Sequence, residues 1–318
     1  MKVLVPLNNT EHLLDYIKAG ASEFYIGFFD KEWEDKFGDF NDINRMSGFR
    51  EIANNCDFNM VLNAMDEIKQ KNKHIYITFN SSIYSMEQLN YIEKYFRILK
   101  EKEVDGVIVS TIELVDLANR VGIPSVISTI AGVYNSDIAR FYKEHGAKRI
   151  ILPRDLSIDE IKQIVSLNRD VEFEVFMMRN GCSFSDSHCL GLHRKEICSI
   201  CSGLKKSEHE LYMKYDSFNG RNNMELNNMI YNNNFHEQAC GLCSIYQFVK
   251  MGITTCKIVG RYDEWREVCN DVELVSKNIE IAGQSTSEEE YLEHMIFPAN
   301  RTSMCKLGLS CYYPEVRY

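Results

Sequence analysis

Residues 105–161 read DGVIVSTIELVDLANRVGIPSVISTIAGVYNSDIARFYKEHGAKRIILPRDLSIDEI. Three short apolar runs in this stretch, GVIVS, PSVIST and RIILPR, alternate with longer segments that carry helical signals. Near-continuous apolar runs are typical of parallel strands that helices cover on both faces. The stretch therefore predicts repeated strand–helix units of an α/β fold.

The same alternation extends over most of the chain. Eight apolar runs are predicted to be strands: 2–7, 23–29, 74–80, 106–110, 124–129, 149–154, 172–178 and 254–260. Eight strands that alternate with helices favour a closed (β/α)8 TIM-like barrel, and a doubly wound open sheet is the alternative. A chain of 318 residues is long enough for one such barrel with an insertion.

Helix starts are marked by serine residues. Three serines stand three residues before a glutamate or glutamine, which is the spacing of a capping box: Ser85, Ser110 and Ser157. In such a box the serine hydroxyl accepts a hydrogen bond from the backbone of the third helical residue. We therefore expect a helix to begin after each of them.

The chain is expected to form one barrel domain over residues 1–281, with a cysteine-rich loop at 179–239 inserted after the seventh strand. Residues 282–318 are predicted to be a C-terminal tail that packs on the barrel. The loop is rich in Asn, Ser, His and Cys. Loops that follow barrel strands form the face on which barrel enzymes do their chemistry. The sequence therefore predicts a functional site in this loop.

Six cysteines gather in or just after the loop: Cys182, Cys189, Cys198, Cys201, Cys240 and Cys243. In a reducing compartment, clustered thiols indicate metal or redox chemistry more often than disulfides. Thiolates are soft ligands that suit an iron–sulfur cluster or zinc. Six thiols exceed the four of one tetrahedral zinc site but can supply a four-thiolate cluster with spares. Some of them can equally be buried packing residues.

Other polar side chains are expected near the same site. Asn80 ends the third predicted strand and Arg154 ends the sixth, so both should point toward the barrel mouth. We predict that they bind substrate, and the alternative is a helix-capping or loop-anchoring role. His188 and His193 lie inside the cysteine loop. They are candidate proton donors or ligands, or else exposed loop histidines.

Charge and composition limit the class of protein. The net charge of −10 argues against a free-standing nucleic-acid binder, because phosphate recognition needs a basic face. A small basic groove is still compatible with that charge. The opening MKVLVPLNN has too short an apolar run for a signal peptide, and no run approaches the length of a membrane span. We therefore expect a cytoplasmic protein.

Several segments resemble peptidase family U32, the collagenase-like peptidases of unassigned mechanism. They are VPLNNTEHLLDYIKAGASEFYIG near the N-terminus, the stretch 105–161, EFEVFMMRNGCSFSDSHC at 172–189 and KIVGR at 257–261. The resemblance extends from residue 2 to about residue 281 and therefore covers the whole predicted barrel.

The resemblance implies a barrel-like fold, a [4Fe–4S] cluster, and an oxidoreductase-type role in oxygen-independent hydroxylation. The hydroxylated molecules are ubiquinone precursors in the UbiU and UbiV type and RNA bases in other branches. The expected substrate is thus an aromatic metabolite or an RNA base, and a second family member is a candidate heteromeric partner. A zinc-stabilised scaffold and a peptidase are the alternative functions. The implied ligands are Cys182, Cys189, Cys198 and Cys240, with Cys201 and Cys243 as alternates.

The tail carries two further cysteines, Cys305 and Cys311, in CKLGLSC. Once four ligands are assigned, they bring the spare thiols to four, together with Cys201 and Cys243. That number permits a second metal site if the tail folds over the cysteine loop. We favour the alternative, in which the tail is held by its aromatic residues and its two thiols are free or disulfide-prone, because spare cysteines are common packing residues.

Overall fold

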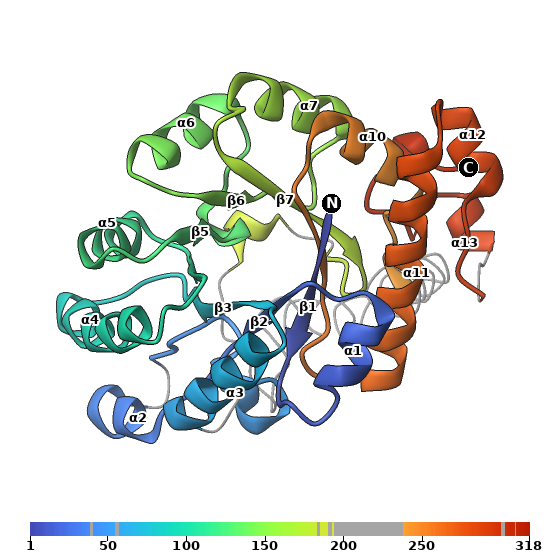
Figure 1. Cartoon of the computed structure of the whole chain (residues 1–318). Coiled ribbons are helices and arrows are strands. Elements are labelled where there is room, and N and C mark those ends of the chain that lie inside the picture. The colour runs from blue at the N-terminus through green and yellow to red at the C-terminus, as the bar shows by residue number, and fades with distance from the viewer. Residues whose placement is uncertain are drawn as a thin grey trace, which may run out of the picture.

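In the computed structural model, eight parallel strands close into a barrel, because β8 pairs with β1 (Figure 1). The structure describes residues 1–38, 41–54, 57–182, 185–189, 193, 238–299, 303–308 and 310–318. The strands are β1 (Lys2–Leu7), β2 (Glu23–Ile26), β3 (His74–Phe79), β4 (Gly106–Val109), β5 (Ser125–Ile127), β6 (Arg149–Ile151), β7 (Glu172–Met178) and β8 (Thr255–Ile258). The predicted (β/α)8 barrel is confirmed, and the open sheet is excluded.

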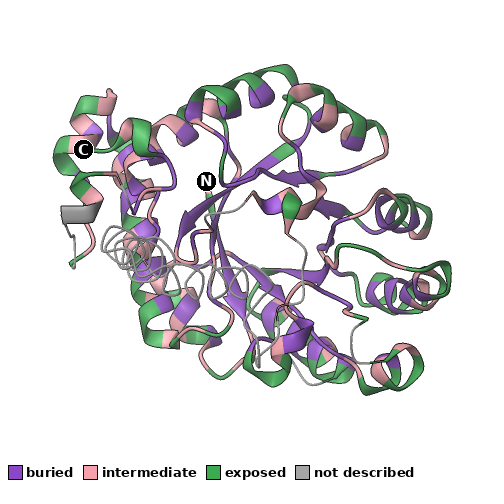
Figure 2. Ribbon diagram, turned by 180° about the vertical axis from the view of Figure 1, so that it is seen from behind, coloured by how far each residue is buried: buried purple, intermediate pink, exposed green. Residues whose placement is uncertain are grey.

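The strands form the centre of the molecule, as their apolar runs predict. Every residue of β2, β4, β5 and β6 is buried, and the strands occupy the buried centre of Figure 2. Several strands are shorter than their apolar runs. The run 23–29, for example, leaves the sheet after Ile26, and its last residues belong to the loop above the barrel.

Helices surround the barrel, and most of them bury one face (Figure 2). The α-helices are α1 (Leu13–Ala19), α2 (Lys31–Phe37), α3 (Phe58–Gln70), α4 (Met86–Glu101), α5 (Ile112–Val121), α6 (Ser136–Glu144), α7 (Ile158–Leu167), α10 (Ile245–Met251), α11 (Trp265–Gln284), α12 (Glu288–His294) and α13 (Ser303–Lys306). Short 3₁₀ helices are η1 (Ser47–Ile52), η2 (Thr129–Ala131), η3 (Asp186–His188), η5 (Leu242–Ser244) and η6 (Pro314–Val316). None of the helices in the described part of the chain is both long and apolar enough to cross a bilayer.

Two of the three predicted helix caps are present. Ser85 and Ser157 form complete capping boxes at the starts of α4 and α7. The prediction for Ser110 is wrong, because α5 begins one residue later, after Thr111, and no side chain caps it. The hydroxyl of Ser110 instead donates a hydrogen bond to the carbonyl oxygen of Ser81. This hydroxyl thus bonds to the loop of the neighbouring strand–helix unit and does not cap the helix that follows it.

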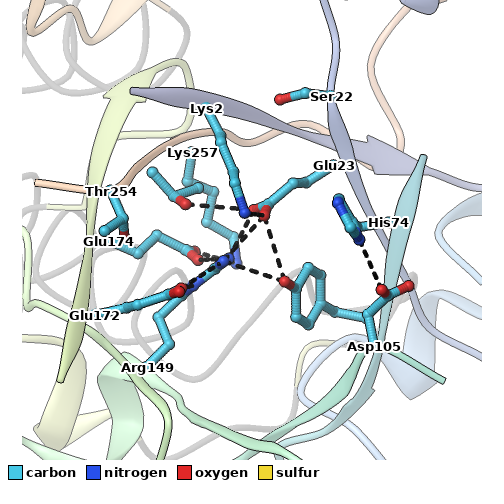
Figure 3. A network of polar contacts seen from close by, with 12 residues as sticks. Lys2, Ser22, Glu23, His74, Asp105, Arg149, Glu172, Glu174, Thr254 and Lys257 are labelled. Carbon is cyan, nitrogen blue, oxygen red and sulfur yellow. Dashed lines mark hydrogen bonds and ion pairs between the residues drawn. The ribbon is translucent and has the colours of Figure 1, made fainter. Parts of the chain in front are cut away.

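A network of buried charges occupies the N-terminal end of the barrel, which we call the barrel floor (Figure 3). Glu23 is fully buried and accepts hydrogen bonds from the Arg149 guanidinium at 2.6 and 2.9 Å. Lys2 donates a further one at 2.9 Å. Glu174 lies 3.5 Å from Arg149 and 3.3 Å from Lys257. Burial would raise the pKa of Glu23, but Arg149 and then Lys2 outweigh it and lower that pKa.

Replacing Glu23 with glutamine should destabilise the protein strongly. Arg149 would then keep its buried charge without its two-point partner, which costs about 3–5 kcal/mol of unfolding free energy. Urea denaturation at pH 7 measures the change. The matched control is Glu273→Gln, which removes the exposed partner of Lys277 on α11 and should have little effect. Equal losses in the two variants would show that the floor network does not stabilise the barrel.

Candidate functional site

The predicted site residues lie at the C-terminal ends of the strands, which together form the barrel mouth. Asn80 follows β3 directly, Arg154 stands three residues after β6, and Cys182 stands four residues after β7. All strands of the barrel run in one direction, so these positions share one end of it. Cys198 and Cys201 lie outside the described residues.

A buried carboxylate anchors the cysteine loop to the mouth. Asp186, on η3, is fully buried. It accepts hydrogen bonds from Arg45 Nη1 at 3.1 Å and from Arg154 Nε at 2.9 Å. Burial would raise the pKa of Asp186, but the charges of Arg154 and Arg45 and their hydrogen bonds outweigh it and hold that pKa below its ordinary value. We call these three residues the Asp186 clamp.

Arg154 and Asn80, which we predicted to bind substrate, make structural contacts here. Arg154 also donates to the carbonyl oxygen of Asn180, and its guanidinium carbon lies 4.2 Å from the centroid of the Phe176 ring. Asn80 Oδ1 accepts from the backbone N–H of Arg45 at 3.2 Å. Both side chains therefore hold the loops of the mouth in place. Their role in substrate binding stays a prediction.

Two of the predicted ligands face the clamp. The thiols of Cys182 and Cys189 are half-buried. Burial lowers the pKa of Arg45, but Asp186 first and then Cys189 and Cys182 raise it above its ordinary value. Cys189 Sγ lies 3.4 Å from Nε2 of His193, and this nitrogen also accepts a hydrogen bond from Arg45 Nε at 3.3 Å. Each thiol thus lies within electrostatic reach of the Arg45 guanidinium.

Cys240, the third described ligand of the implied set, lies at the end of β7. It forms a β-bridge with Met178, the last residue of that strand. Burial chiefly raises the pKa of the Tyr312 hydroxyl, and Cys182 and Cys240 add to that increase. Tyr312 therefore lies within electrostatic reach of both cysteines. Cys182 and Cys240 thus lie at the β7 side of the mouth, whereas the carbonyl oxygen of Cys189 accepts a hydrogen bond from Ser82, in the loop after β3, at 3.4 Å.

The two tail cysteines lie beside Cys240 and Cys243, not on the far side of the barrel. A second β-bridge joins Cys240 to Cys311. A small cavity of about 10 Å³ is lined by residues that include Cys240, Cys243, Cys305 and Cys311. Such a volume is about that of one water-sized sphere. A second metal site at the tail stays a prediction, and Cys201 lies outside the described residues.

Aromatic residues hold the tail, as we favoured. Tyr312 and Tyr313 are 4% and 3% exposed. The Tyr313 hydroxyl donates to the carbonyl oxygen of Phe176 at 3.1 Å, and the Tyr312 hydroxyl donates to that of Arg179. The tail is therefore fixed to the end of β7, directly beside the cysteine loop.

Thiols are the type of ligand that a soft metal prefers, but the described thiols are not arranged around a metal position. Among the described residues, no three His, Cys, Asp or Glu side chains are arranged to hold an ion. The implied fourth ligand, Cys198, lies outside those residues. The described chain thus supplies the donor chemistry of an iron–sulfur site and the positive charges beside it.

Three residues of the mouth were not recognised from the sequence pattern alone. Arg45 follows no strand and carries no local signal. Asp186 is the only acidic residue between Cys182 and Cys189, which could have marked it as an anchor. Arg261 was noted only as the end of KIVGR, although it stands three residues after β8. It lines a cleft of about 290 Å³.

Replacing Asp186 with asparagine should destabilise the protein in a pH-dependent way. Two buried guanidinium groups would lose their shared carboxylate, which lowers the free energy of unfolding at pH 7 by about 3–5 kcal/mol. Because the folded-state pKa of Asp186 is lowered, its contribution is fully present above the unfolded pKa of about 3.9. The difference from wild type should therefore vanish as the pH falls through the folded-state pKa.

Urea denaturation between pH 3 and pH 7 follows this difference. The matched control is Asp66→Asn, which removes the exposed partner of Lys102 and should change stability little. A difference between wild type and Asp186→Asn that stayed constant over the whole pH range would contradict an ionised Asp186 in the clamp.

Comparisons with known proteins give the chain a family. The model of peptidase family U32 matches residues 8–307. An uncharacterized protease of Methanocaldococcus jannaschii, MJ0090, is 28% identical over 63% of this chain and 47% of its own length. The tRNA hydroxylation protein P1 of Bacillus subtilis is 24% identical over 94% of this chain and 69% of its own length. The tRNA hydroxylation protein P of Helicobacter pylori J99 is 28% identical over 45% of this chain and 35% of its own length.

The chain thus spans from about a third to about two thirds of the length of these relatives. Among solved structures, that of the U32 peptidase Mk0906 aligns with a TM-score of 0.43 at 17% identity, over 56% of this chain and 69% of that one. The family match, in contrast, covers nearly the whole sequence, and the chain belongs to peptidase family U32.

Proposed function

We propose that this chain holds a four-cysteine iron–sulfur cluster at the barrel mouth and supports the oxygen-independent hydroxylation of a base in RNA. The observation that carries the proposal is the position of Cys182 and Cys189. Both thiols lie at the mouth, in the electrostatic neighbourhood of Arg45, where barrel enzymes do their chemistry. Zinc is the alternative metal for the same thiols.

Cys182, Cys189 and Cys240 would hold the cluster together with Cys198, and Cys201 and Cys243 are the alternates. A bound cluster supplies electron transfer, at a potential set by burial and by hydrogen bonds to its sulfurs. The Asp186 clamp fixes the segment between the first two ligands, so their thiols have a defined place before any metal binds. His193, 3.4 Å from the sulfur of Cys189, is a group that can hold a proton there.

Relatives support RNA as the substrate class. Four of the proteins similar to this chain are named tRNA hydroxylation proteins, so a tRNA base is the first candidate. The net charge of −10 does not oppose this, because the Asp186 clamp itself contains two cations and one anion. Arg45 and Arg154 share a single carboxylate there, which leaves an excess of positive charge for phosphate groups. An aromatic metabolite is the second candidate.

Deletion of the gene in its own organism tests the substrate. One hydroxylated nucleoside should disappear from total tRNA, as measured by mass spectrometry of nuclease digests. The wild-type gene should restore it, and Cys189→Ser should not, because a proposed ligand is lost. The matched control Cys269→Ser, on α11, should restore it fully. An unchanged nucleoside pattern after deletion would contradict an RNA substrate, and restoration by Cys189→Ser would contradict the cluster.

A further inference from the structure

A glycine and two asparagines position the side chain of Arg261 at the mouth. A Cβ atom added to Gly27, directly after β2, would overlap the guanidinium of Arg261 and the side chain of Asn54. Arg261 Nη1 donates to Asn54 Oδ1 at 3.2 Å and to Asn44 Oδ1 at 3.5 Å. The guanidinium therefore has a fixed position that depends on the absence of a side chain at residue 27.

The positive charge of Arg261 is not balanced by the described part of the chain. Its hydrogen bonds there go only to amide oxygens, and no ion pair joins it to a carboxylate. Arg45 and Arg154, in contrast, each pair with Asp186, and Arg149 pairs with Glu23. Burial lowers the pKa of Arg261 to about 10; Tyr25 opposes this shift, and Arg45 adds to it.

The nearest carboxylates along the sequence are engaged elsewhere. Asp263 accepts a hydrogen bond from Asn180 Nδ2 at 3.0 Å. Glu264 accepts from the backbone N–H groups of Arg266 and Glu267 and so caps α11. A half-buried cation that the protein holds rigidly without a carboxylate is typical of a site that an anionic ligand completes.

The cleft beside Arg261 has room for a small molecule. We call it the Arg261 cleft. Its volume of about 290 Å³ is close to the lower limit of ordinary ligand pockets, about 300 Å³. Its lining includes Asn8, His12, Tyr262 and Trp265. The His12 and Trp265 rings are stacked with centroids 3.8 Å apart. The cleft thus offers aromatic surface and one guanidinium, and the carboxylates of Asp263 and Glu264, which are engaged as described above, also line it.

We propose that the Arg261 cleft binds a small organic oxyanion, whose carboxylate or phosphate group pairs with the Arg261 guanidinium. Nη1 is engaged by the two asparagines, and the other guanidinium N–H groups can donate to the anion as a planar fork. The aromatic side chains of the cleft would pack against the body of the ligand. This binding is independent of the proposed cluster and hydroxylation, so it can be tested on protein without iron.

Tryptophan fluorescence measures binding in the whole chain. Trp265 lines the cleft, and the only other tryptophan of the chain is the buried Trp33. Benzoate, inorganic phosphate and uridine 5′-monophosphate serve as oxyanion probes, with benzyl alcohol and uridine as their neutral counterparts. At least one oxyanion should give a saturable change, and its neutral counterpart should bind at least about tenfold more weakly. Saturation with benzoate alone assigns a carboxylate, and saturation with a phosphate probe alone assigns a phosphate.

Arg261→Gln should weaken the binding of that oxyanion by at least about tenfold, because a charge-assisted contact is lost. Arg261→Lys keeps the charge but not the fork, and should bind more weakly than wild type. The matched control Arg120→Gln, on the outer helix α5, should bind like wild type. Thermal unfolding shows whether each variant is folded. If Arg261→Gln is not folded, the affinity of Arg261→Lys decides the outcome. The proposal is overturned if no oxyanion binds saturably, or if folded variants of Arg261 bind as tightly as wild type.

Discussion

The arrangement of the barrel mouth depends on the ion pairs of the Asp186 carboxylate. This carboxylate is fully buried and lies between Arg45, in the loop after α2, and Arg154, after β6. Removing it would leave two guanidinium groups close together without a counter-charge, which low-dielectric surroundings make costly. Asp186 stands between Cys182 and Cys189 in the sequence. Its ion pairs anchor η3, and Cys189 follows η3 directly.

Buried charges are paired differently at the two ends of the barrel. In the floor, Arg149 and Lys257 each have a carboxylate partner, Glu23 and Glu174, so that end stabilises the fold and offers nothing to a ligand. At the mouth, Arg45 and Arg154 share one carboxylate, and the hydrogen bonds of Arg261 within the described residues go only to amide oxygens. Paired charges at the floor and incompletely paired cations at the mouth fit the usual division in such barrels between stability and chemistry.

The fold could be predicted from the sequence because strands buried on both faces must read as apolar runs. Local signals such as Ser85 and Ser157 were equally dependable, since a capping box involves only neighbours in the chain. Ser110 failed because its hydroxyl bonds to Ser81 from another unit, and no local pattern reports such a contact. The thiols were visible as a cluster of cysteines. Arg45 and Arg261 were not, because their roles depend on residues distant in sequence.

The metal content of the protein purified without oxygen tests the central claim most directly. A [4Fe–4S] site predicts a brown protein with about four iron atoms and about four acid-labile sulfides per chain, and with little zinc. The chain has enough thiols to bind either metal, so the measured iron, sulfide and zinc content of the protein decides between the two. A colourless protein that carries about one zinc ion and no sulfide would contradict the account, because the mouth would then hold a structural metal site.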